Sequence, residues 1–174
     1  MRHIVHNYKR YFKGKCLDIG STFNTINLMP NDAVGINVVK QDDDRIIIHD
    51  LNENKLSFED NTFDFILFSH TIEHLDSPHL ILNECRRVLK EDGRMIIAIP
   101  FKNSKGYNIK HSRGHTYYWN KEAFKEFLKL HDFRIVRCYY NYWLGWKIFY
   151  FITNILFPGL FAWDIHVMVE KEDK

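Results

Sequence analysis

Residues 63–100 read FDFILFSHTIEHLDSPHLILNECRRVLKEDGRMIIAIP, a strand, a helix and a second strand in close succession. Residues 63–69 are apolar at nearly every position, which is typical of a central strand in a parallel sheet that helices cover on both faces. An amphipathic helix opens after Ser77, and we expect it to end at Gly93. Residues 94–100 form another buried strand, so the stretch predicts one βαβ unit.

Shorter apolar runs on either side extend this unit into a larger sheet. A second helix begins after Asn120, which is a favourable N-cap residue. Strands that alternate with helices predict an α/β fold with a doubly wound parallel sheet and right-handed crossovers. No linker or internal repeat divides the chain, so we expect one domain over residues 1–174. The further strands that we expect are residues 15–19, 33–38, 45–49, 133–138 and 165–170.

The composition is that of an ordinary globular protein. Of the 174 residues, 45% are hydrophobic and 26% are charged, which excludes a disordered or collagen-like chain. The net charge of +2 gives no electrostatic reason to expect nucleic-acid binding. The three cysteines, Cys16, Cys85 and Cys138, form no CxxC pair, and the amino terminus lacks the apolar core of a signal peptide. We therefore expect a cytoplasmic protein.

In doubly wound folds, ligands bind beyond the carboxyl ends of the strands, at the point where the strand order reverses. For this chain we expect that point between the strand at residues 15–19 and the strand at residues 63–69. The first of these strands runs into LDIGSTFN at residues 17–24. This segment places an acid and a glycine turn where backbone amides can approach a ligand.

Six segments, taken in order, resemble the motifs of class I S-adenosylmethionine-dependent methyltransferases of the type 11 group. The likeness covers roughly residues 15–138 and resumes in the last strand. It implies a Rossmann-like methyltransferase fold with a mostly parallel sheet of seven strands, the last of them antiparallel, and S-adenosylmethionine as the cofactor. The segments are LDIGSTFN (17–24), GIN (35–37), HDL (49–51), FEDNTFDFILFSHTIEHLDSP (58–78), NECRRVLKEDGRMIIAIP (83–100) and GHTYYWNKEAFKEFLKLHDFRIV (114–136).

The resemblance implies roles for the residues at the matching positions. Asp18 would contact the cationic methionine end of the cofactor, and Asn37 stands where the family has the acid that binds both ribose hydroxyls. Thr22 and Asn24 replace two glycines of the first motif. These departures support a second hypothesis, a non-catalytic binding or regulatory module with a degenerate cofactor site. The cofactor-binding residues that we predict are Asp18, Gly20, Ser21, Thr22, Asn37, Val38, Asp50, Leu51 and Ser69.

Methyl transfer needs an oriented acceptor and, for a hydroxyl or ammonium acceptor, a base. Histidine titrates near neutral pH, and the motifs place His70, His111 and His115 at the open end of the sheet. We predict that these three are catalytic; the alternatives are ordinary surface groups and, for the last two, a gate over the pocket. The expected acceptor is a small or amphiphilic, lipid-like molecule and not a nucleic acid.

The string HTIEH at residues 70–74 also fits HxxEH, a zinc-peptidase pattern in which two histidines bind the metal and the glutamate activates water. Zinc hydrolysis is therefore a minor alternative. It would need a long helix, which residues 76–78 (DSP) interrupt. We therefore assign no metal ligands from the sequence.

Residues 139–163 form an apolar, aromatic insertion before the last strand. Three interpretations stay open for this insertion: core packing or a dimer surface, an apolar lid or membrane-surface element, and a membrane span. The strand that follows must return to the sheet, which argues against a span. Few residues precede the first strand, so we expect a pocket that is either open or completed by a second copy of the chain in a homodimer.

Overall fold

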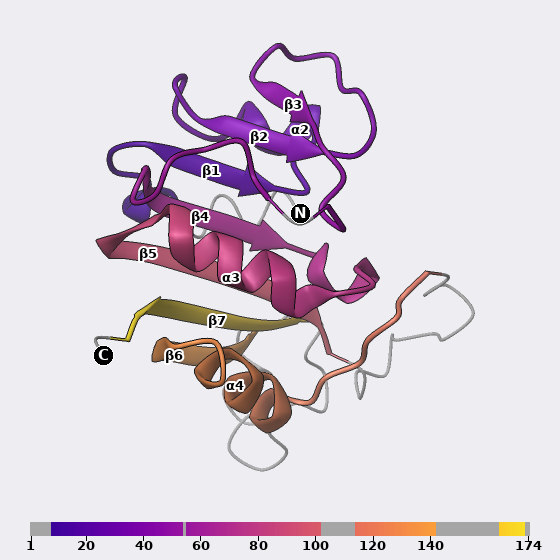
Figure 1. Ribbon diagram of the computed structural model, residues 1–174, viewed down its shortest axis with the longest axis vertical. Helices are drawn as coiled ribbons and strands as arrows, with labels where there is room; N and C mark the ends of the chain where they lie inside the picture. Colours follow the sequence, from indigo (N-terminus) through magenta and orange to yellow (C-terminus); the bar gives the residue numbers. More distant parts are fainter. Residues whose placement is uncertain (1–7, 54, 102–113, 142–163, 173–174) are drawn as a thin grey trace, which may run out of the picture.

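The computed structural model describes residues 8–53, 55–101, 114–141 and 164–172. They contain one seven-stranded sheet in the order β3-β2-β1-β4-β5-β7-β6 (Figure 1). The pairs among β1 to β5 are parallel, and β7 is antiparallel to both β5 and β6, which confirms the predicted fold class. The strands are β1 (Cys16–Ile19), β2 (Val34–Asn37), β3 (Ile46–Ile48), β4 (Phe63–Ser69), β5 (Leu89–Pro100), β6 (Phe133–Asn141) and β7 (Asp164–Lys171).

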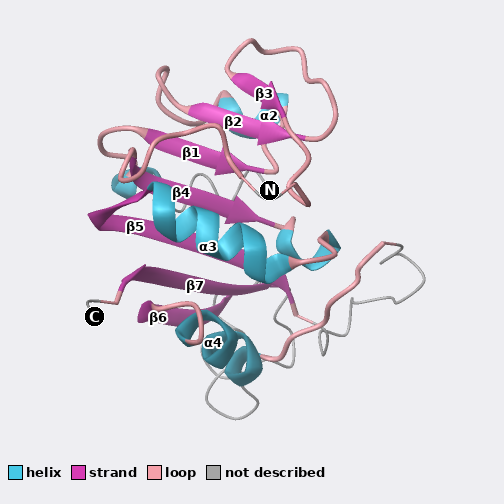
Figure 2. Ribbon diagram, in the orientation of Figure 1, coloured by secondary structure: helices cyan, strands magenta, loops and turns pink. Residues whose placement is uncertain are grey.

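Helical segments cover both faces of the sheet. Helices α3 (Pro78–Val88) and α4 (Lys121–Lys129) lie on one face (Figure 2), and the short segments η1 (Lys9–Tyr11) and α2 (Phe23–Ile26) belong to the other. Successive residues of β4 point to opposite faces, so Ile66 and Phe68 join the core under α3, whereas Phe65 and Leu67 join the core that contains Ile26. Two buried faces explain why this strand is apolar at nearly every position.

The expected end of the first long helix at Gly93 is wrong. Helix α3 ends at Val88, and β5 begins at Leu89 and continues through Gly93. Leu89 is fully buried and pairs with Phe63, and the register then shifts before the next pair. Close packing against Leu89 explains why residue 93 is a glycine, because a Cβ at this position would lie 2.8 Å from the Leu89 side chain.

The connection between β3 and β4 contains no helix in its described residues and is held by hydrogen bonds and ion pairs of Arg87. Residues 49–53 and 55–62 form no helix. Arg87 of α3 donates hydrogen bonds of 3.0 Å to the Leu56 carbonyl and 2.8 Å to the Phe58 carbonyl. The same guanidinium pairs with Glu84 at 2.6 Å and with Asp60 at 2.8 Å. The predicted alternation of strands and helices is therefore incomplete on this side of the sheet.

The aromatic insertion falls almost entirely outside the described residues. Residues 139–141 end β6, and residues 142–163 are not described. Among the helices of the described ranges, none has the length and apolar character that a membrane crossing requires. The homodimer and the contact of residues 139–163 with a membrane surface stay predictions.

Candidate functional site

The strand order places the expected switch point between β1 and β4. Strand β1 pairs with β2 on one side and with β4 on the other. Gly20 follows β1 and has a φ of +77°, and a Cβ at this position would lie 1.9 Å from the Thr71 hydroxyl oxygen. The turn therefore needs glycine both for its backbone conformation and for its close approach to the loop that follows β4.

The two residues that replace family glycines lie in ordinary backbone conformations. Thr22 has φ −125° and ψ 160° and stands at the N-cap of α2, which contains Asn24. The Thr22 backbone N–H donates a 2.8 Å hydrogen bond to the Thr25 hydroxyl. The loop therefore uses left-handed backbone at Gly20 and opens directly into a short helix, so a threonine fits without strain.

Asn37 connects the end of β2 to this loop. Its side-chain amide donates a 2.6 Å hydrogen bond to the Ser21 carbonyl oxygen, and its own oxygen accepts a 2.9 Å bond from the Val39 backbone N–H. The Ser21 N–H in turn donates to the Ile36 carbonyl at 2.8 Å. An aspartate has no N–H to donate, so the asparagine suits this connection better than the family's acid would.

Two buried oxygens at the switch point have no hydrogen-bond partner among the described residues. They are Asp18 Oδ2, on β1, and Ser69 Oγ, at the end of β4. Burial raises the pKa of Asp18 to about 6. Hydrogen bonds with Ser21 and Thr25 lower this pKa, but their effect is smaller than that of burial. Buried polar atoms are normally paired, so these two oxygens mark a place where a ligand would supply donors.

Of the other predicted cofactor residues, two have exposed side chains and one has a buried side chain. Val38 follows β2 and is 60% exposed, next to the exposed Val39 and close to the exposed end of β3 at Ile48. Asp50 is exposed and accepts a 2.9 Å hydrogen bond from the Asn52 N–H. The Leu51 side chain belongs to the core. Val38 and Asp50 are therefore accessible to a ligand, whereas the buried Leu51 side chain anchors the turn to the core.

His70 is held between two carboxylates. It has a φ of +50°, its Nε2 lies 3.2 Å from Asp164 Oδ1, and its Nδ1 lies 3.7 Å from Glu73 Oε1. Burial alone would lower the pKa of His70, but the two carboxylates outweigh burial and raise it to about 9. His70 is therefore a cation near neutral pH, a state in which it can donate hydrogen bonds but cannot accept a proton.

A hydrogen-bonded group behind Asp164 was not anticipated from the sequence. His166, fully buried on β7, shares a 2.5 Å hydrogen bond with the Tyr8 hydroxyl, which also bonds to the hydroxyl of Tyr139. Burial lowers the pKa of His166 and raises that of Tyr8, so both groups are neutral near pH 7. The group attaches the amino-terminal segment to the last two strands.

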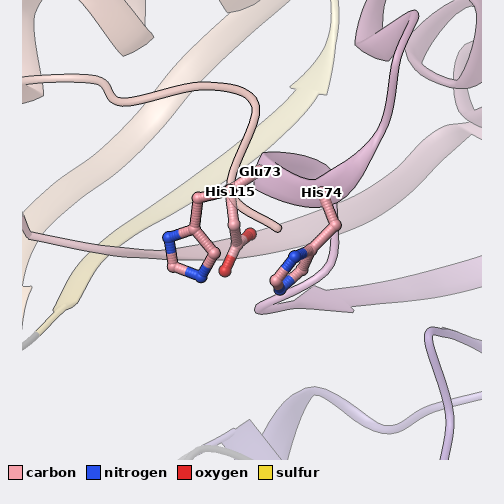
Figure 3. Close-up of side chains that lie close together, drawn as sticks. All are labelled: Glu73, His74 and His115. Carbon is pink, nitrogen blue, oxygen red and sulfur yellow. The ribbon is translucent and has the colours of Figure 1, made fainter. Parts of the chain in front are cut away.

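A second cluster lies beyond His70, at the turn η2 (Ile72–His74). The Glu73 carboxylate lies between the imidazoles of His74 and His115 (Figure 3), and the ligand atoms of the three side chains lie within 4.8 Å of one another. Burial lowers the pKa of His115, so its imidazole is neutral near pH 7. The third predicted catalytic residue, His111, lies outside the described residues.

Comparisons with known proteins agree with the fold and with the motifs. Residues 17–97 match the model of a family described as a methyltransferase domain. An uncharacterized protein of Methanocaldococcus jannaschii is 28% identical over 171 residues, a match that covers 91% of this chain and 61% of that protein. This chain therefore spans less than two thirds of that relative's length.

Solved structures show the same architecture. A SAM-dependent methyltransferase from Archaeoglobus fulgidus matches with a TM-score of 0.77 and 21% identity, over 98% of this chain and 92% of that one. A 1,6-didemethyltoxoflavin-N1-methyltransferase from Burkholderia thailandensis, with bound 1,6-didemethyltoxoflavin and S-adenosylhomocysteine, matches with a TM-score of 0.67 and 16% identity, over 99% of this chain and 76% of that one. These matches confirm the predicted fold, and the family model matched by residues 17–97 supports the resemblance found in the motifs.

Proposed function

We propose that this chain, whose residues 17–97 match the methyltransferase domain model, binds S-adenosylmethionine at the carboxyl ends of β1 and β4 and transfers its methyl group to a small-molecule acceptor. The observation that carries the proposal is that two buried oxygens at the switch point, Asp18 Oδ2 and Ser69 Oγ, have no hydrogen-bond partner within the described part of the chain. A ligand with hydrogen-bond donors would remove the penalty of leaving them unpaired.

The residues around this point fit the cofactor at both ends. The cationic methionine end matches the carboxylate of Asp18, which burial otherwise disfavours in its charged form. The exposed side chain of Val38 offers apolar surface to the adenine ring. Asn37 fits least well, because its amide is already bonded to Ser21 and its oxygen to Val39. We therefore expect ribose binding to be weaker than in a site with an aspartate.

The chemistry divides between the cofactor and the chain. S-adenosylmethionine supplies a methyl group on a sulfonium sulfur, which a lone pair of the acceptor displaces in line to leave S-adenosylhomocysteine. The chain's part is to bind, exclude water and orient the acceptor. His70, as a cation, is suited to donate a hydrogen bond or to hold an anionic acceptor, whereas neutral His115 has a lone pair for a proton or a cation.

Calorimetric titration with S-adenosylmethionine and S-adenosylhomocysteine tests the proposal. We expect micromolar binding, about −8 kcal/mol. The variant Asp18→Asn should weaken the binding of both ligands about tenfold or more, because a charged hydrogen bond contributes about 1.5–3 kcal/mol. Ser57→Ala, at an exposed position in the loop before β4, should bind like the wild type.

A wild-type protein that binds neither ligand at millimolar concentration would contradict the proposal. It would favour the binding or regulatory module instead, since the fold would then be present without its usual cofactor. Equal affinities of the wild type and Asp18→Asn would show binding elsewhere on the molecule and would also overturn the proposed site.

A further inference from the structure

A carboxylate is buried at η2 with one oxygen unpaired. Glu73 is 1% exposed, and its Oε2 has no hydrogen-bond partner among the described residues. The other oxygen, Oε1, lies 3.7 Å from Nδ1 of His70. A buried polar oxygen without a partner is costly in free energy. A cation beside Oε2 would remove that cost.

Two histidines reach the same carboxylate from two segments of the chain. His74 follows Glu73 directly, His115 comes from the segment before α4, and the ligand atoms of all three groups lie within 4.8 Å of one another (Figure 3). Two imidazoles and one carboxylate are a known ligand set for catalytic zinc. We propose that Glu73, His74 and His115 bind one zinc ion, with a coordination position left for an outside ligand.

The required geometry is within reach of small side-chain rotations. Zinc–ligand bonds of about 2.0–2.1 Å in a tetrahedral site place ligand atoms about 3.3 Å apart, so the longest separation in the cluster must shorten by about 1.5 Å. His74 is exposed and His115 is half-buried, so closing the site would move side chains near the surface and not in the core. The buried Glu73 is the fixed point around which they close.

Hydrogen bonds already orient the ligands. The Gly114 carbonyl oxygen lies 3.0 Å from His74 Nδ1, so this nitrogen carries the proton and Nε2 keeps the lone pair that a metal needs. A backbone carbonyl in this role is typical of zinc-binding histidines. The Glu73 carbonyl accepts hydrogen bonds from the N–H groups of Thr116 at 2.8 Å and Tyr117 at 3.2 Å, which fixes the His115 segment against η2.

His70 is not one of the ligands. Its Nε2 lies 3.2 Å from Asp164 Oδ1 and its Nδ1 lies 3.7 Å from Glu73 Oε1, so its ring nitrogens face carboxylate oxygens other than Glu73 Oε2. The proposal thus differs from the HxxEH pattern, because Glu73 is a ligand here and not a base. It also replaces the expectation that the chain has no metal ligands.

The open position would take an oxygen ligand. Since η2 follows β4 closely, this position lies on the same edge of the sheet as Ser69, the last residue of β4. Zinc lowers the pKa of a bound water or hydroxyl. The class of ligand that suits the fourth position is therefore a water molecule or the hydroxyl or carboxylate oxygen of a small molecule.

Zinc titration of the tag-free full chain, after removal of metals with a chelator, tests the site. We expect one equivalent of Zn²⁺ by calorimetry, and Co²⁺ in its place should give the visible absorption of a tetrahedral complex. His115→Ala and Glu73→Gln each change a direct ligand, so they should weaken zinc binding by more than the factor of about 10–100 that loss of an outer-shell partner costs. His115→Cys should restore part of the affinity, since thiolate is a zinc ligand. His79→Ala, an exposed histidine on α3, is the matched control and should bind zinc like the wild type.

Melting temperatures separate loss of a ligand from loss of fold. In chelator, His115→Ala should still unfold in one transition, with a melting temperature lowered only by the loss of its ring contacts with His74 and Tyr118. Added zinc should raise the melting temperature of the wild type but not that of the variant. A wild type that binds no stoichiometric zinc, or a His115→Ala that binds it equally well, would overturn the proposal. Neither result depends on S-adenosylmethionine, so the methyltransferase proposal is tested separately.

Discussion

The side-chain amide of Asn37 donates a 2.6 Å hydrogen bond to the carbonyl oxygen of Ser21. It thereby connects the end of β2 to the loop that follows β1, at the position where the family that the motifs resemble is expected to have an acid. The Asn37 amide therefore makes a structural hydrogen bond. An aspartate at this position could not make it, because a carboxylate has no hydrogen to donate.

Asn37→Asp should therefore destabilise the protein, even though it restores the family's residue. A carboxylate beside the Ser21 carbonyl replaces an attraction with a repulsion, and we expect a loss of about 1–3 kcal/mol in the free energy of unfolding. Urea unfolding would measure it. Asn52→Asp is the control, because the Asn52 side-chain oxygen accepts a 2.9 Å bond from the Asp76 N–H and a carboxylate can do the same. Equal stability of both variants would contradict this account of Asn37.

Gly20→Ala should be more damaging than another substitution at a left-handed glycine. At Gly20 an added Cβ meets both the positive φ and the Thr71 hydroxyl at 1.9 Å, whereas at Gly114, with φ +93°, the nearest atom is 3.7 Å away. Backbone strain alone costs about 1–3 kcal/mol, so Gly114→Ala should show that loss and Gly20→Ala a larger one. Urea unfolding of the two variants side by side measures the difference, and similar losses would show that the contact with Thr71 relaxes freely.

Asp18→Asn should stabilise the ligand-free protein at high pH. Burial raises the pKa of Asp18 to about 6 in the folded chain, against about 3.9 when unfolded. The stability that goes with the protonated carboxyl is fully present below about pH 4 and is lost as the pH rises through about 6. At pH 8 the neutral asparagine avoids this loss, which amounts to about 2–3 kcal/mol.

Unfolding by urea at pH 5 and pH 8, without cofactor, measures the effect of Asp18→Asn. The advantage of the variant should grow between the two pH values, because the wild type loses more stability than the variant does. A constant difference would mean that Asp18 titrates alike in the folded and unfolded chain. If the expected result is found, Asp18→Asn raises the free energy of unfolding at pH 8 but lowers the affinity for S-adenosylmethionine.

The sheet could be predicted because its signals are local. Residues 63–69 and 94–100 are apolar runs that report burial on both faces of a strand, and the expected switch point between β1 and β4 follows from chain order alone. The end of α3 was predicted wrongly for a reason that is not local. Gly93 reads as a helix stop, but its neighbour in space is the Leu89 side chain, and the pairing of Leu89 with Phe63 begins the strand earlier.

The site was predicted only in part, because its partners are distant in the sequence. The motifs indicate Asp18 near the end of β1, Gly20 directly after it and Ser69 at the end of β4, and these two strands are neighbours in the sheet. Nothing in the sequence indicates that Asp164 lies 3.2 Å from His70, or that His115 comes within reach of Glu73. Such contacts depend on how β7 and the segment before α4 return to the end of β4.

Tyr8→Phe should show how much of the stability rests on one such distant contact. The Tyr8 hydroxyl bonds to Nδ1 of the fully buried His166, and these residues are 158 positions apart. Removing the hydroxyl leaves a buried nitrogen unpaired, at a cost of about 1–3 kcal/mol in the free energy of unfolding. Tyr11→Phe is the control, since the Tyr11 hydroxyl makes no hydrogen bond to the described residues, and it should change the stability little.

The size of that loss also tests whether the amino-terminal segment is part of the cooperative fold. Tyr8 packs in the core that includes Phe65 of β4 and Met168 of β7, so its loss should lower the single unfolding transition of the whole sheet. If Tyr8→Phe instead left global unfolding unchanged and only increased hydrogen exchange in residues 8–12, the segment would open independently. The sheet would then be stable without it, and the bond between Tyr8 and His166 would only hold the segment in place.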